Sequence, residues 1–143
     1  MHAKPVGSWE TVAAGQHGLI SRKQAISLGI TRRQIDGFLK RRSWIRMLPR
    51  VYRVAAAPQT WHQPLMAASL WADGKAVISG RSAAALWELE GYWRSRVELC
   101  GCSDLSPPPG VVYRQVKYLR PADITVCRGI RAATSRQAAI ASP

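Results

Sequence analysis

Thirteen polar or charged residues between positions 22 and 53 have side chains of the kinds that bind nucleic acid. An arginine can donate two parallel hydrogen bonds to O6 and N7 of guanine, and both arginine and lysine pair with phosphate. Aspartate, threonine and glutamine side chains can add hydrogen bonds to base edges. The candidates are Arg22, Lys23, Thr31, Arg32, Arg33, Gln34, Asp36, Lys40, Arg41, Arg42, Arg46, Arg50 and Arg53.

The positive charge of the chain is concentrated in the same part of the sequence. The 143 residues carry a formal net charge of +13. Residues 1–57 contain eleven Lys and Arg against Glu10 and Asp36, a net +9, whereas residues 58–143 contain ten against six acidic residues, a net +4. Clustered cations are the electrostatic signature of a polyanion-binding surface. The distribution therefore favours a nucleic-acid partner for the first part of the chain.

Two Ser/Thr-x-x-Gln patterns mark the starts of two consecutive helices. Ser21 and Gln24 form the first pattern, and Thr31 and Gln34 form the second. In such a capping box the hydroxyl accepts from the third helical N–H, and the glutamine reaches back to the N–H of the capping residue. Gly29 lies in the short turn between the two helices, where a helix-turn-helix often has glycine.

The second of these helices is expected over residues 32–41 and to be amphipathic. Its i, i+3, i+4 spacing places Ile35, Phe38 and Leu39 on one face, and Phe38 is expected at the centre of the core. The outward residues are then Arg32, Arg33, Asp36, Lys40 and Arg41.

A basic hairpin is expected directly after this helix. Residues 44–54 read as two short strands around Leu48-Pro49-Arg50, and Arg46, Arg50 and Arg53 lie along them. A further helix, residues 8–16, precedes the two capped helices. The sequence therefore predicts a winged helix-turn-helix DNA-binding domain over residues 1–57.

Different DNA contacts are expected for different candidates. Arg32, Arg33 and Asp36 lie at the start of the second helix, the end that usually enters the major groove, and are expected at base edges. Arg50, at the hairpin tip, is expected to reach an adjacent minor groove. The residues expected to fix position through phosphate contacts are Arg22, Lys23, Lys40, Arg41 and Arg42.

A second unit is expected over residues 58–143, after a linker at 55–59. A third capping box, Thr60 to Gln63, predicts a helix to residue 73, and Ser82 is expected to cap a helix over 83–89. Strands are expected at 76–78, 96–100, 112–118, 124–126 and 129–130, and a last helix from 134–135. The predicted fold class is α+β: a winged helix-turn-helix followed by a small α/β domain with a short mixed or antiparallel sheet.

Several segments resemble the AbiEi-type antitoxin and transcriptional-regulator family. These segments are residues 17–25, 29–35, 50–53, 82–87 and 129–135. The resemblance implies an N-terminal winged helix that binds its own promoter, followed by an α/β region linked to antitoxin activity. Many relatives continue from about Thr134-Ser135 into an endonuclease-like domain. Because residues 137–143 do not read as that continuation, the resemblance suggests a second domain that is incomplete at its C-terminus.

No catalytic pattern is found. A restriction-type nuclease needs an acidic residue and an acid-x-Lys pair to hold Mg²⁺, and neither Glu98 nor Asp123 is followed by such a lysine. Glu88 and Glu90 are expected at a solvated helix end. The three histidines are too scattered for a metal site. We therefore expect no catalytic residue, no metal and no cofactor.

The cysteines and the hydropathy point to a cytoplasmic protein. Cys100, Cys102 and Cys127 are odd in number and lack CxxC spacing, so reduced thiols are expected. No apolar run approaches the length of a membrane span, and the N-terminal residues lack the apolar core that is typical of a signal peptide.

The expected function is sequence-specific binding of double-stranded promoter or operator DNA by a transcriptional repressor or antitoxin-like autoregulator, which could act as a homodimer. One alternative is a module that binds a toxin or another protein, with the helix-turn-helix as scaffold. Another is the non-catalytic N-terminal part of an endonuclease-like protein. Tyr113, Arg114 and Lys117, on one predicted strand, leave RNA binding as a further alternative.

Overall fold

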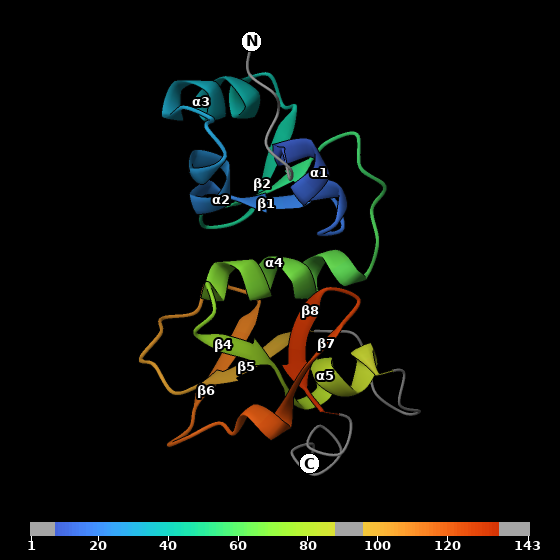
Figure 1. Ribbon diagram of the computed structural model, residues 1–143, viewed down its shortest axis with the longest axis vertical. Coiled ribbons are helices and arrows are strands. Elements are labelled where there is room, and N and C mark those ends of the chain that lie inside the picture. Colours follow the sequence, from blue (N-terminus) through green and yellow to red (C-terminus); the bar gives the residue numbers. More distant parts are fainter. Residues whose placement is uncertain (1–7, 88–95, 135–143) are drawn as a thin grey trace. The chain divides into compact units, whose positions relative to one another are not determined.

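The computed structural model describes residues 8–87 and 96–134 of the chain (Figure 1). It belongs to the α+β class, and the chain divides into two compact units, residues 1–71 and 72–143. The sequence had suggested a division between residues 57 and 58. The observed boundary lies later in the chain because most of the helix His62–Ala72 belongs to the first unit.

The first unit combines helices with a small antiparallel sheet. Its strands have the order β1-β3-β2, so the third of them in sequence is the central strand of this sheet. The elements, in chain order, are α1 (Trp9–Ala14), β1 (Leu19–Ser21), α2 (Arg22–Ser27), α3 (Arg32–Lys40), β2 (Trp44–Leu48), β3 (Val51–Val54) and α4 (His62–Ala72).

Both capping boxes before α2 and α3 are confirmed. Ser21 Oγ accepts from Gln24 N at 3.1 Å, and Gln24 Oε1 accepts from Ser21 N at 3.0 Å. The box of Thr31 and Gln34 has the corresponding bonds at 3.1 and 2.8 Å. Between the helices Gly29 has φ 93°, a left-handed conformation that glycine adopts without steric penalty. A Ser or Thr followed three residues later by Gln thus determines where each of the two helices begins.

The core of the first unit is centred on Ile35 and Trp44 rather than on Phe38. Ile35 is fully buried and Trp44 is 2% exposed, whereas Phe38 is only partly buried and packs against this cluster. The rings of Phe38 and Trp44 stack with centroids 4.6 Å apart, and Trp9 packs against both. The expectation that Phe38 occupies the centre was therefore wrong, because Trp44 from β2 takes that place.

Two features of the first unit depend on contacts that are distant in sequence. Strand β1 was not expected, and it forms by pairing with β3, with Ile20 opposite Tyr52. The expected capping box at Thr60 does not form, because the Gln63 side chain instead donates to the carbonyls of His17 and Pro58 at 2.7 and 2.9 Å. Gln63 thus anchors α4 to the turn after α1.

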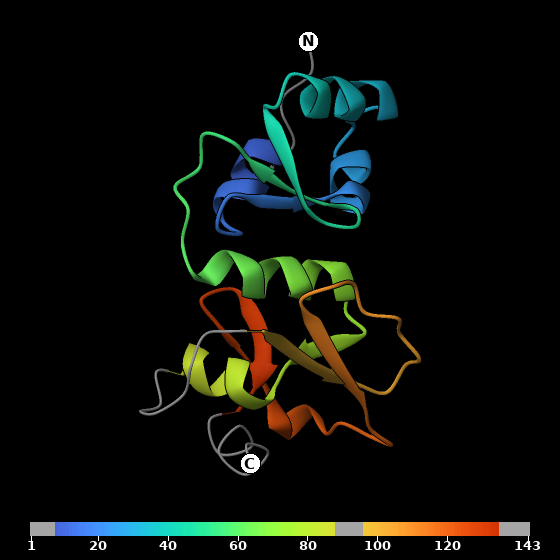
Figure 2. The ribbon, with the colours of Figure 1, turned by 180° about the vertical axis from the view of Figure 1, so that it is seen from behind.

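The second unit contains a mixed five-stranded sheet of order β6-β5-β4-β8-β7 (Figure 2). Strand β4 is antiparallel to β5 and parallel to β8, and β6 is parallel to β5. Strands β7 and β8 form an antiparallel pair. The elements are β4 (Ala76–Ile78), α5 (Gly80–Leu86), β5 (Val97–Gly101), β6 (Val111–Gln115), the 3-10 turn η1 (Pro121–Asp123), β7 (Ile124–Cys127) and β8 (Ile130–Ala133).

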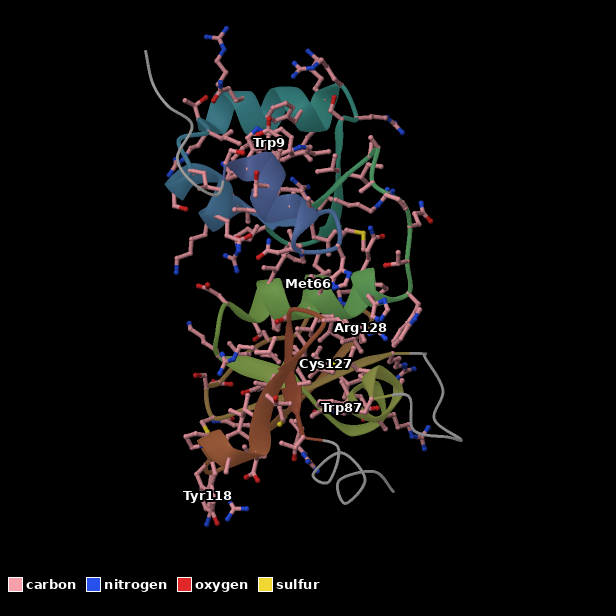
Figure 3. The ribbon with its side chains drawn as sticks, turned by 45° about the vertical axis from the view of Figure 1, so that its right-hand side comes forward. Trp9, Met66, Trp87, Tyr118, Cys127 and Arg128 are labelled. Atoms are coloured by element: carbon pink, nitrogen blue, oxygen red, sulfur yellow. The ribbon has the colours of Figure 1, made fainter. Side chains whose placement is uncertain are left out.

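Helix α5 begins three residues before the expected start. Its N-cap is Ser79, and Ser82 does not cap it. The Ser82 hydroxyl instead accepts from Glu98 N at 2.8 Å and donates to Arg96 O at 3.0 Å. At the other end, Trp87 Nε1 donates to Ala133 O at 2.8 Å, which ties α5 to the end of β8 (Figure 3).

Some expectations fall on residues outside the described ranges. These are the helix end with Glu88 and Glu90, and the last helix beyond Thr134. Among the helices that are described, none combines the length and apolar character needed to cross a bilayer.

Candidate nucleic-acid interface

Helix α3 has one side that faces away from the rest of the first unit (Figures 1 and 2). Side chains tipped with nitrogen extend from this side into solvent (Figure 3). The sequence-predicted outward residues are all exposed: Arg32, Arg33, Asp36, Lys40 and Arg41. Within residues 8–87 and 96–134, none of these four cations forms an ion pair. Their charges are therefore available to a ligand.

A shallow depression lies along this outward side. It is lined by Thr31, Arg33, Gln34, Gly37, Phe38 and Arg41. The Arg41 guanidinium carbon lies 5.5 Å from the centroid of the Phe38 ring, a cation–π geometry. The depression thus has an apolar floor, over which the Arg41 guanidinium lies, and Arg33 as a second cationic lining residue.

Gly37 and Phe38 were not among the sequence-predicted site residues. A glycine inside a helix destabilises it by roughly 0.5–1 kcal/mol relative to alanine, since it has more conformational freedom to lose. Gly37 is not among the glycines with positive φ, so the backbone does not require it there. Its position four residues from both Arg33 and Arg41 was the signal in the sequence that could have identified the depression.

A second depression joins the end of α3 to the hairpin. It is lined by Leu39, Arg42, Trp44, Ile45 and Arg46. Arg42 and Arg46 are both exposed and form no ion pair in the described part of the chain. The structure thus brings together two candidates that the sequence assigned to different elements.

A third group of candidates lies where α2 meets the hairpin. Arg22 donates from Nη1 to the Tyr52 hydroxyl at 3.3 Å, and Arg22 N donates to Arg50 O at 2.8 Å. The hydrogen bond that Arg22 donates to the Tyr52 hydroxyl raises the pKa of Arg22 above its usual value, and the nearby Asp36 carboxylate acts in the same direction. Tyr52 therefore holds the Arg22 guanidinium in place, a role that the sequence did not indicate.

The remaining candidates differ in how much of their side chains is available. Lys23 is exposed on α2, whereas Arg53 in β3 is half-buried. Thr31 and Gln34 both serve in the capping box of α3, yet both remain exposed. Their capping roles leave the Thr31 hydroxyl hydrogen and the Gln34 amide hydrogens as donors.

No model of a known protein family matches this chain, and no curated protein sequence matches it. The interpretation of the basic surface thus depends on its geometry. Arg33 and Arg41 flank one depression, Arg42 and Arg46 line the next, and Arg22 lies beside the hairpin.

Four charged side chains of the second unit contact other groups of the same unit. Glu98 Oε2 accepts from Arg81 N at 3.0 Å and so satisfies the first turn of α5. Arg120 forms an ion pair with Asp123 at 3.0 Å, and Arg131 donates to Gly74 O at 3.4 Å. The hydrogen bond to the start of α5 therefore gives Glu98 a structural role.

The described residues contain no group of three His, Cys, Asp or Glu side chains arranged to hold a metal ion. All three cysteines are free. Cys100 is buried, and its burial raises the pKa of the thiol. It lines a cavity with Arg114, Tyr118 and Arg120 among others.

Proposed function

We propose that the first unit is a winged helix-turn-helix that binds double-stranded DNA sequence-specifically. The observation that carries the proposal is the row of exposed cations without ion pairs on α3, continued by Arg42 and Arg46 toward the hairpin. The strand order β1-β3-β2 around two consecutive capped helices supports α3 as the recognition helix and the β2–β3 hairpin as the wing.

In this proposal α3 enters the major groove with its N-terminal end first. Arg32 and Arg33 contact base edges there, and guanine is the base whose O6 and N7 suit an arginine. Arg41 and Arg42, at the C-terminal end of the helix, bind phosphates and so fix the register of the protein on the duplex. Arg50, at the wing tip, reaches the neighbouring minor groove.

The biological role proposed is that of a transcriptional repressor that controls its own promoter. The resemblance of residues 17–25, 29–35 and 50–53 to the AbiEi-type antitoxin and regulator family supports this role. A cytoplasmic location agrees with DNA as the partner and with free thiols. The proposed activity is binding alone, with neither a catalytic step nor a cofactor.

The experiment is a titration of the purified chain with DNA from upstream of its own gene, at several salt concentrations. If four to six phosphates are neutralised, the affinity should fall with a log–log slope of about −4 to −5. A random duplex of equal length is the control and should bind more weakly with a similar slope. No binding at low salt, or a slope near zero, would contradict the proposal. Adding Mg²⁺ to the same samples should leave the DNA uncut.

A further inference from the structure

Gly37 lies near the middle of the outward side of α3, one helical turn from Arg33 and one from Arg41. On a recognition helix this side is the one nearest the bases. A side chain at this position would be expected to project toward the DNA, and glycine has none.

The space above Gly37 is narrow. A Cβ atom at this position would lie 2.9 Å from Arg41 Nη1 and 3.7 Å from Arg41 Cζ. Such a contact involves only the far end of a flexible side chain, which can move aside. Alanine would therefore fit the folded protein and would favour the helix. The stability of the fold therefore does not explain why this residue is glycine.

We propose that Gly37 and the Phe38 ring receive the 5-methyl group of a thymine, which makes Gly37 a specificity-determining residue. The inference rests on the proposed function. Among the groups that base pairs display in the major groove, the thymine methyl is the apolar one. The floor of the depression is apolar. In the unbound protein the Arg41 guanidinium lies over this floor, 5.5 Å from the centroid of the Phe38 ring and next to Gly37, so in the proposed complex it turns away to a phosphate and leaves the floor to the methyl group.

The first test compares Gly37→Ala with Gly15→Ala. Gly15, the C-cap of α1, has φ −74°, and a Cβ there would meet its nearest atoms at 3.6 Å, so alanine fits equally well. Both variants should unfold at the same or a higher denaturant concentration than the wild type. Gly37→Ala should bind the cognate duplex at least about tenfold more weakly, since the methyl slot is filled. Wild-type affinity in Gly37→Ala would overturn the inference.

The second test removes the methyl group from the DNA. Each thymine of the cognate duplex is replaced in turn by uracil, which pairs identically. One replacement should weaken wild-type binding about fourfold, the value expected for one buried methyl group. The same replacement should have no effect on Gly37→Ala. If no uracil changes the wild-type affinity while the duplex still binds, the inference fails and the proposed function stands. If no duplex binds at all, the proposed function itself fails.

The third test asks whether Gly37 serves only to seat Arg41 on Phe38. Gly37→Ala is introduced into an Arg41→Ala background, and the two effects are compared in a double-mutant cycle. A slot for thymine predicts that Gly37→Ala still weakens cognate binding about tenfold in this background. Loss of the Gly37→Ala effect would assign the glycine to Arg41 alone and would overturn the inference.

Discussion

The two units use their charged residues in different ways. In the second unit Glu98 caps α5, Arg120 pairs with Asp123 and Arg131 bonds to Gly74 O. In the first unit the arginines of α3 are exposed and form no ion pair within the described residues. Exposed unpaired charges contribute little to folding stability. Their concentration on one helix, α3, is therefore better explained by a ligand than by the fold.

Several residues at the basic surface of the first unit also depart from the backbone conformation or residue type that is locally favoured. Arg42 and Arg50 have φ of 59° and 62°, the left-handed region in which glycine is favoured. Gly37, in contrast, occupies a helix interior in which alanine is favoured. Violations of local preference tend to occur at functional sites. Arg42, Arg50 and Gly37 lie on or beside the basic surface, and His17, Asp73 and Arg128 are left-handed elsewhere in the chain.

The largest expected effect is the loss of stability when a core residue of the first unit is removed. Trp44→Ala should destabilise the first unit by about 3–5 kcal/mol, since it removes a buried ring that Phe38, Trp9 and Tyr52 contact. DNA binding should be lost with it. Circular dichroism melts and fluorescence anisotropy with labelled duplex measure the two effects.

Two controls sharpen this first prediction. Trp44→Phe keeps an aromatic ring and removes a buried indole N–H that has no hydrogen-bond partner among the described residues, so it should cost less. Leu99→Ala, in the core of the second unit, should cost about 2–5 kcal/mol. Loss of DNA binding in Leu99→Ala under conditions where the first unit stays folded would contradict the assignment of binding to the first unit.

The next largest effect is a difference in DNA affinity among three variants that each lose one arginine, at different places in the molecule. Arg33→Ala should weaken binding to the cognate duplex by about 1–3 kcal/mol and change random-DNA binding little, whereas Arg41→Ala should weaken both alike. Arg114→Ala, an exposed arginine of the second unit, should change neither. Anisotropy titrations with both duplexes measure all three. Equal losses for Arg33→Ala and Arg114→Ala would mean that net charge, and not the α3 surface, governs binding.

The sequence predicted features that depend on neighbours along the chain. Ser21 with Gln24 and Thr31 with Gln34 are three residues apart, so side-chain type alone sets both helix starts. The exposed side of α3 follows from its 3.6-residue period in the same way. Of the second unit's strands, β4 was predicted to the residue and β5 and β7 to within one residue, whereas the predicted ends of β6 and β8 are three residues off.

The sequence failed where a distant residue offers a better contact. Strand β1 has three residues and forms only through β3. Gln63 caps nothing, because the His17 carbonyl lies within 2.7 Å of its amide nitrogen. Phe38 is displaced from the core centre by Trp44. In the candidate site Arg22 was predicted but its partner Tyr52 was not, since tyrosine in a strand is usually explained by packing.

A smaller effect is expected for the acidic residue that caps α5. Glu98→Ala should destabilise the second unit by about 0.5–2 kcal/mol, as the loss of other capping side chains does, because Arg81 N loses its acceptor. Asp104→Ala, which removes an exposed carboxylate, is the matched control and should cost less. Both variants should bind DNA like the wild type. A larger change in DNA affinity than in the unfolding free energy of Glu98→Ala would give Glu98 a role in the interface.

The smallest effect compares two arginines that share a left-handed conformation. Arg50, at the hairpin tip, has φ 62°, and Arg128, in the turn between β7 and β8, has φ 54°. Glycine at either position relieves a strain of about 1–2 kcal/mol. It also increases the freedom of the unfolded chain, which opposes that gain by about 0.4–1 kcal/mol. The net stability change of Arg50→Gly should therefore be small and favourable.

If Arg50 contacts a phosphate or the minor groove, Arg50→Gly should also flatten the log–log salt slope by about 1, whereas Arg128→Gly should leave the slope unchanged. Anisotropy titrations at several salt concentrations measure the slope, and urea denaturation checks the stability. An unchanged slope in Arg50→Gly would remove the hairpin tip from the interface and leave α3 and Arg46 as the contacts to DNA.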